Sequence, residues 1–139
     1  WRFKVLKGKS KNSLGDFLAK KYKDNNPKFS KFRYDRIIEK TKKSSVVILI
    51  CMQRDPLESI PEWEEIASVS MSVQNMWLMC TKLNIGSYWS SPKIIDSIHE
   101  FTNLNKGEKC LGIFYMGNYD KEINARTPRP IQDKVIWLD

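Results

Sequence analysis

Residues 66–81 read Ile-Ala-Ser-Val-Ser-Met-Ser-Val-Gln-Asn-Met-Trp-Leu-Met-Cys-Thr and carry no charge. The run is too short to span a membrane but long enough for several turns of helix. A helix without charge on any side cannot face water, so we expect it to be covered by its own sheet on one face and by a second subunit on the other. The alternative is the central helix of a larger monomeric core, which 139 residues are too few to wrap fully.

The residues around this run mark the ends of the helix. Ser59-Ile-Pro-Glu62 combines a serine, an early proline and an acid three residues after the serine, which predicts a capping box with Ser59 as the N-cap. Acids in the first turn and Lys82 in the last suit the two ends of the helix dipole. Asn84 and Gly86 then end the helix.

Two apolar segments and one segment of alternating residue types predict the strands of a sheet. Ser45–Met52 is rich in β-branched residues, which indicates a central strand that is buried on both faces. Lys109–Met116 is a second such strand, and Trp1–Leu6 is a third that starts abruptly with an aromatic residue, so we expect the natural start to lie upstream. With helices between the strands, the fold class is α/β or α+β with a covered sheet.

The remaining elements have weaker patterns. Residues 8–12 predict a turn, after which Ser13 caps a helix that runs to about Tyr22. The pattern is compatible with a second helix near residues 34–42. Pro92 opens a short helix, and residues 134–138 predict a terminal strand.

Positive charge is concentrated in the first third of the chain. The net charge is +8, and residues 1–45 hold fifteen Lys and Arg against four Asp and Glu. This asymmetry is compatible with a solvated basic face, an anionic small ligand or cofactor, or a nucleic-acid surface. The basic residues are mostly lysines without a nucleic-acid-binding motif, so the solvated face is the favoured interpretation and nucleic acid the least favoured.

Side chains that usually carry catalysis are scarce. The three cysteines, Cys51, Cys80 and Cys110, stand far apart in the sequence without metal or redox spacing, which predicts buried free thiols in a reducing compartment. His99 lies three residues after Asp96, a pairing more typical of surface decoration than of a catalytic dyad. We find no metal-ligand cluster and no phosphate-binding or dinucleotide motif, so reactivity is expected from a bound cofactor. The chain opens without a signal-peptide pattern, and we expect a soluble cytoplasmic protein.

The segment Gly86-Ser-Tyr-Trp-Ser-Ser-Pro92 is the strongest candidate for a ligand site. It is expected to leave the buried helix as a loop, so that backbone N–H groups are free to point at a ligand. Its serines supply hydroxyls, and Trp89 supplies an aromatic plane that can pack against a flat ring. Flavin recognition needs both features, although polar-aromatic loops are also common without a ligand.

Six segments in this order resemble the FMN-dependent nitroreductase family, and within it the compact bacterial NAD(P)H nitroreductases of the YdjA type. Each segment alone is weakly specific, but together they cover nearly the whole chain. They are Trp1-Arg-Phe, Ser45–Met52, Pro61-Glu-Trp-Glu-Glu65, Ser72-Val-Gln-Asn-Met76, Leu83-Asn-Ile-Gly-Ser-Tyr-Trp89 and Leu111-Gly-Ile-Phe-Tyr-Met-Gly117.

The resemblance implies an α+β sandwich, in which helices flank a central, mostly antiparallel sheet, and an intertwined homodimer with a long buried interface helix. It implies FMN at the dimer interface, NAD(P)H as the hydride donor, and nitroaromatic, quinone-type or other electron-poor small molecules as acceptors. By position, Trp89, Ser90 and Ser91 would line the FMN, and residues 79–84 would lie near the nicotinamide. Arg129 matches a late basic residue that many members turn toward the FMN phosphate, and the alternative is an exposed loop arginine.

One departure from the family pattern concerns the start of the chain. Family members open with a helix that carries an Arg-Arg-Ser type motif for the phosphate and ribityl chain, followed by a second flavin-contacting loop, and neither is present in this sequence. We therefore expect residues 1–139 to form a single nitroreductase-like domain that lacks the family's N-terminal helices. A flavin-free binding or regulatory module of the same fold is the alternative function, and a basic nucleic-acid-binding protein is a more distant one.

Overall fold

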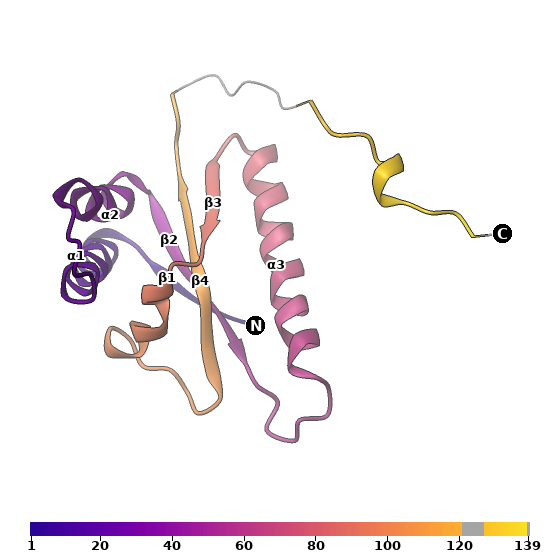
Figure 1. The fold of residues 1–139 in the computed structure, drawn as a ribbon, viewed down its shortest axis with the longest axis horizontal. Coiled ribbons are helices and arrows are strands. Elements are labelled where there is room, and N and C mark those ends of the chain that lie inside the picture. Colours follow the sequence, from indigo (N-terminus) through magenta and orange to yellow (C-terminus); the bar gives the residue numbers. More distant parts are fainter. Residues whose placement is uncertain (121–126, 139) are drawn as a thin grey trace.

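A four-stranded antiparallel sheet forms the centre of the computed structural model, which describes residues 1–120 and 127–138 (Figure 1). All three pairs of neighbouring strands are antiparallel. This confirms the α+β class with a mostly antiparallel sheet. In spatial order the strands are β1 (Arg2–Leu6), β2 (Val46–Gln53), β4 (Glu108–Gly117) and β3 (Gly86–Ser90).

The strand expected at the centre of the sheet lies there. β2 has β1 on one side and β4 on the other, and its residues 47–52 are all buried. Val47, Leu49 and Cys51 belong to one apolar cluster, whereas Ile48, Ile50 and Met52 belong to another. Alternate side chains of a strand point to opposite faces, so a strand that is covered on both faces has to be apolar throughout.

Helices cover both faces of the sheet (Figure 1). On one face lie α1 (Gly8–Asp24), α2 (Lys31–Lys43) and the 3₁₀ helix η1 (Lys93–Glu100). On the other face lies α3 (Glu62–Lys82), which buries Val69, Val73 and Cys80 against the sheet. The expected packing of this helix on its own sheet is therefore confirmed. Its opposite side is exposed in the single chain, with Trp63, Met71 and Leu78 all open to solvent.

The first helix begins earlier than expected. A turn over residues 8–12 and an N-cap at Ser13 are both wrong, because α1 starts at Gly8 and the Ser10 hydroxyl accepts a hydrogen bond from the Lys7 N–H at 3.3 Å. A tertiary contact explains the extra turn. The buried Lys11 ammonium donates to the carbonyl oxygens of Thr41 at 2.5 Å and Lys42 at 3.1 Å. A cation at these last carbonyls of α2 is stabilised by the helix dipole.

Close contact between α1 and α2 depends on a glycine. A Cβ at Gly15 would lie 2.0 Å from the Thr41 hydroxyl oxygen, so only glycine allows the two helices this approach. α2 contains the expected residues 34–42 and begins at Lys31, where the Ser30 side chain accepts a hydrogen bond from the Arg33 N–H. These two helices contain most of the lysines and arginines in the basic first third of the chain.

The start of α3 differs from the predicted capping box. Pro61 is the N-cap, and it makes no side-chain capping bond. The Ser59 N–H donates to the Asp55 carboxylate at 3.0 Å, and Glu62 pairs with Lys109 at 2.5 Å. The Ser59 N–H thus bonds to a nearby carboxylate and the Glu62 side chain to a distant lysine, so neither takes part in the predicted cap. The predicted end of the helix is confirmed, since Asn84 has the left-handed φ of 54°.

The predicted terminal strand at residues 134–138 is also wrong. Gln132–Lys134 form a short 3₁₀ turn, and residues 135–138 have no regular structure. Ile136, Trp137 and Leu138 are at least 85% exposed. The residue pattern predicted a strand, but no strand among the described residues lies beside this segment to pair with it.

Candidate functional site

The candidate site lies where the sheet narrows from four strands to three. β3 pairs only with residues 113–117 of β4, so the first half of β4 has no neighbour on that side in the described part of the chain. Trp89 and Ser90 are the last residues of β3, and Ser91 follows directly. Three of the four predicted FMN contacts thus lie at a strand end, where the backbone N–H and C=O groups on the outer edge of β3 have no sheet partner among the described residues.

The expected loop over residues 86–92 is wrong for its first five residues. α3 leads almost directly into β3, because the Ile85 N–H bonds back to the Cys80 carbonyl and the aromatic pair Tyr88–Trp89 favours a strand. Part of the backbone polar groups of this segment therefore bond to β4. The groups left for a ligand are those on the outer edge of β3 and those of Ser91.

Trp89 directs its side chain between the sheet and α3. The ring packs against the cluster that contains Ile50, Val73 and Phe114, and its indole Nε1 is buried without a hydrogen-bond partner among the described residues. Gly112 makes room for it, since a Cβ there would lie 2.1 Å from that Nε1. A buried N–H without an acceptor costs free energy, so an oxygen or ring nitrogen of a ligand would be stabilised here.

The residues at this strand end fit one part of a flavin better than the others. The Trp89 N–H, the half-buried Ser90 and the exposed Ser91 offer donors and hydroxyls, which match the oxygens and nitrogens at the pyrimidine end of the ring system. None of the three carries a positive charge for a phosphate. The fit is therefore with the ring and not with the phosphate.

Arg129 is not brought to this strand end. It is exposed, and the segment of residues 127–138 extends past α3 and away from the sheet (Figure 1). In a single chain its guanidinium thus has the environment of an exposed loop arginine. Its predicted contact with an FMN phosphate stays a prediction.

Residues 79–84, which the resemblance places near a nicotinamide, form the end of α3 and the turn into β3. Met79 and Leu83 are more than half exposed, whereas Cys80 is buried under the helix. The turn leads directly to the start of β3, while the predicted flavin contacts lie at the strand's far end. A flat ligand that touches both would have to lie along the outer edge of β3.

A hollow of about 490 Å³ lies beside the first residues of β3. Lys40 and Lys43 of α2 line it together with Tyr88 and Tyr115, whose rings stack at 5.0 Å. The Lys40 ammonium is 5.9 Å from the centre of the Tyr88 ring. Here the basic part of the chain does contribute cations to a concave surface, which is compatible with the anionic-ligand interpretation of its charge.

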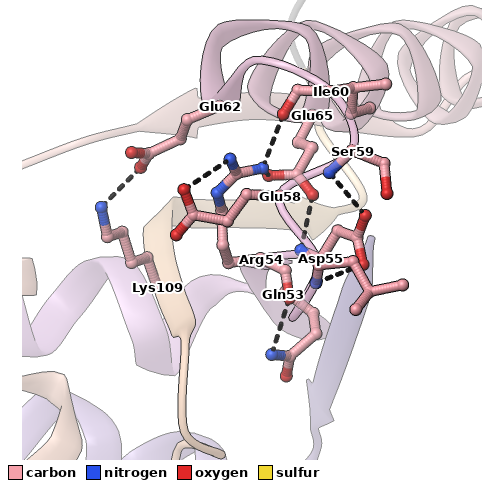
Figure 2. Close-up of polar contacts among 10 residues, drawn as sticks. Gln53, Arg54, Asp55, Glu58, Ser59, Ile60, Glu62, Glu65 and Lys109 are labelled. Atoms are coloured by element: carbon pink, nitrogen blue, oxygen red, sulfur yellow. Dashed lines mark hydrogen bonds and ion pairs between the residues drawn. The ribbon is translucent and has the colours of Figure 1, made fainter.

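The charged residues around the start of α3 form one polar network (Figure 2). Figure 2 shows the Arg54 guanidinium among three partners, the Glu65 carboxylate at 2.7 Å, the Ile60 carbonyl at 2.9 Å and the Glu58 carboxylate at 3.6 Å. The second oxygen of Glu65 accepts a hydrogen bond from the Asp55 N–H at 2.7 Å. These contacts fasten the loop after β2 to the first turn of α3, so the acids there have a structural role.

The Asp55 carboxylate also stabilises this loop, by hydrogen bonds to other residues of the loop. It accepts hydrogen bonds from the N–H groups of Leu57 at 3.1 Å and Ser59 at 3.0 Å. The Ser59 hydroxyl, supported by the N–H groups of Leu57 and Ser59, holds the pKa of the Asp55 carboxyl below its usual range. An acid followed by proline is a turn signal in the sequence, but its partners were not predictable.

His99 and Asp96 do not form a dyad. The His99 ring Nδ1 lies 2.9 Å from the backbone oxygen of Asp96, not from its carboxylate, and both side chains are exposed. Within residues 1–120 and 127–138, no three His, Cys, Asp or Glu side chains gather closely enough to hold a metal ion. None of the helices in that part of the chain has the length and hydrophobicity that crossing a membrane requires.

Two features of the site were missed by reasoning from the sequence. The first is Gly112, whose signal was present, since a glycine inside an apolar strand often marks the close approach of another group. The second is the proximity of Cys51 to Cys110, which are direct partners across β2 and β4. Their distance in the sequence gave no sign of it.

Comparison with known proteins identifies the family to which this fold belongs. The model of the nitroreductase family matches residues 1–118. A Bacillus subtilis (strain 168) protein named "Putative NAD(P)H nitroreductase YfhC" is 27% identical over 89 residues, which are 63% of this chain and 45% of that protein. The chain thus spans less than half the length of this relative.

Solved structures share the architecture. A nitroreductase-like family protein from Bacillus cereus has a TM-score of 0.78 at 23% identity, over 99% of this chain and 73% of that one. A "putative nitroreductase in complex with fmn" from Desulfovibrio desulfuricans has a TM-score of 0.67 at 20% identity, over 99% and 72%. This likeness confirms the nitroreductase-like sandwich. Because the family model matches most of its residues, the chain belongs to the nitroreductase family.

Proposed function

We propose that this chain is part of an FMN-dependent NAD(P)H oxidoreductase that reduces electron-poor small molecules. The observation that carries the proposal is the unpartnered Trp89 N–H, buried beside Ser90 at the end of edge strand β3. Support comes from family membership, from the FMN bound to the Desulfovibrio desulfuricans relative, and from the NAD(P)H in the name of YfhC.

Each residue at the strand end has a defined task in this proposal. The Trp89 N–H, the backbone of Ser90 and the Ser91 hydroxyl would hold the polar end of the flavin and orient its ring, since the Ser90 side chain points to the opposite face of the sheet from Trp89. The exposed edge of β3 would add backbone donors. Hydrogen-bond donors fixed in this way favour negative charge on the ring, which is the form that reduction produces.

Bound FMN would supply two-electron chemistry between a reduced nicotinamide and the acceptor. The chain then needs no nucleophile of its own, and its residues only position the reactants and limit access of water. We propose a ping-pong order, in which the oxidised nicotinamide leaves before a nitroaromatic or quinone-type acceptor enters the same place. Residues 79–84 and Arg129 are proposed contacts for the nicotinamide and for the FMN phosphate, respectively.

The working unit is proposed to be a homodimer that joins through the outer side of α3. The exposed apolar residues on this helix include Trp63, Ile66, Met71, Leu78 and Met79. Apolar side chains exposed along a whole helix are typical of an interface, and a second copy of the same helix would cover them. Arg129 would then act at a site that both subunits share.

FMN binding by two matched tryptophan variants tests the ring contact. Trp89→Phe keeps an aromatic ring but removes the N–H, whereas Trp1→Phe makes the same change at the exposed residue before β1. We expect FMN titration of the protein to give a dissociation constant at least several-fold weaker for Trp89→Phe and unchanged for Trp1→Phe. Equal FMN affinity of Trp89→Phe and the wild type would contradict this site.

A further inference from the structure

Cys51 and Cys110 lie side by side in the core of the sheet, although they are far apart in the sequence. They are direct partners in the register of β2 and β4, next to a bulge between Ile50 and Cys51. Opposite residues of antiparallel strands have Cα atoms about 4.5–5.5 Å apart, inside the range of about 4.4–6.8 Å that disulfides require. Both side chains pack in the same apolar cluster, so they share one face of the sheet.

The two thiols differ in access. Cys51 is fully buried, whereas Cys110 is partly exposed and lines a hollow of about 520 Å³ together with His99, Glu108 and Lys109. Cys110 therefore borders this hollow, whereas Cys51 does not.

The thiols also differ in reactivity. A hydrogen bond from the Cys51 thiol lowers the pKa of Cys110, and the same bond, together with burial, raises the pKa of Cys51. The thiolate is the reactive form of cysteine, so the accessible thiol is also the activated one. This is the arrangement of an attacking cysteine with a resolving cysteine behind it.

We propose that Cys51 and Cys110 form a reversible redox modification site that accepts low-molecular-weight disulfides of the glutathione class. The Cys110 thiolate attacks one sulfur of the small disulfide, a mixed disulfide forms, and the other half leaves as a thiol after taking up a proton. The Cys51 sulfur then attacks the Cys110 sulfur, its proton passes to the second leaving half, and a Cys51–Cys110 disulfide forms. Two protein thiols are oxidised, and one small disulfide is reduced to two thiols.

The third cysteine is the matched control. Cys80 is buried on the other face of the sheet, in the cluster under α3, and has neither of the other two thiols in its cluster. It therefore reports whether oxidation needs the pair or affects any thiol. The inference does not depend on flavin binding, because none of its residues belongs to the strand end of β3.

Mass spectrometry of the folded protein after treatment with glutathione disulfide tests the proposal, with free thiols alkylated after acid quenching and denaturation. We expect the wild type and Cys80→Ser to lose the mass of two hydrogens, and their digests to contain a linked pair of Cys51 and Cys110 peptides. Cys51→Ser is expected to retain one glutathione on Cys110, and Cys110→Ser to retain none. Alkylation of both Cys51 and Cys110 in the treated wild type overturns the proposal, as does a glutathione that stays on wild-type Cys110. Since the wild type and Cys80→Ser decide it, the proposal stays testable if a variant in the core fails to fold.

Discussion

The Trp89 indole lies so close to Gly112 that a residue with a Cβ at position 112 would clash with it. A Cβ at residue 112 would lie 2.1 Å from the indole Nε1 and 2.7 Å from the Ser90 carbonyl oxygen. The glycine on β4 thus sets the position of the tryptophan on β3. The candidate ligand site and the packing of the sheet depend on the same contact.

Gly112→Ala is expected to displace Trp89 and to destabilise the fold by about 1–3 kcal/mol, the usual cost of overpacking a core. FMN affinity should fall in the same variant, since the indole N–H moves. Urea unfolding and FMN titration check the two effects. Gly117→Ala is the milder comparison on the same strand, because a Cβ there would meet the Ser45 backbone nitrogen at 3.3 Å, which is tight but far less close than 2.1 Å, so we expect a smaller loss of stability. If Gly112→Ala were as stable as the wild type, the close contact with Trp89 would not restrict position 112 to glycine.

The close approach of α1 and α2 makes a second prediction. Gly15→Ala places a Cβ 2.0 Å from the Thr41 hydroxyl oxygen, and we expect a loss of about 1–3 kcal/mol in the free energy of unfolding. Thr41→Ala removes that oxygen, so the double variant should lose less than the sum of the two single variants. Additive losses in the double-mutant cycle would contradict the clash.

Lys11 joins the same two helices by hydrogen bonds. Lys11→Met removes a buried ammonium that serves the Thr41 and Lys42 carbonyls, and a loss of about 1–3 kcal/mol in the free energy of unfolding is expected. Lys9→Met changes an exposed lysine of the same helix and should leave stability nearly unchanged. Equal thermal midpoints for both variants would show that the Lys11 bonds contribute nothing.

The loop before α3 should become less stable in acid. The pKa of Asp55 is lowered in the folded state by its hydrogen bonds with Ser59 and Leu57, so its contribution is present above the unfolded value of about 3.9 and is lost as the pH falls through the folded pKa. Asp55→Asn removes this contribution, and its loss of stability on acidification should be smaller than that of the wild type. Urea midpoints at neutral and acid pH measure the difference. Asp133→Asn, at an exposed position, should behave as the wild type does.

The sequence predicted the elements whose pattern is set by burial. β2 is apolar because both its faces are covered, and α3 ends just before Asn84 because the chain adopts a left-handed conformation there. It failed where tertiary partners replaced local ones. Glu62 does not complete the predicted capping box, because its carboxylate pairs with Lys109 of β4, and α1 starts early, because Lys11 reaches the end of α2.

The residue types of the candidate site were predictable from the sequence, but the backbone conformation of the site was not. The polar and aromatic residues of the segment 86–92 were identified, but the strand conformation of residues 86–90 was not, because β3 depends on β4 as a partner. Gly112 and the pairing of Cys51 with Cys110 follow from strand register, which the pattern of single segments does not determine.

The visible absorption spectrum of the purified protein, recorded with FMN and then with NADPH or NADH, tests the proposed oxidoreductase most directly. We expect a protein-bound flavin spectrum that bleaches when the reduced nicotinamide is added and returns in air. A protein that retains no flavin after gel filtration with excess FMN, or a bound flavin that neither nicotinamide bleaches, would contradict the proposed function.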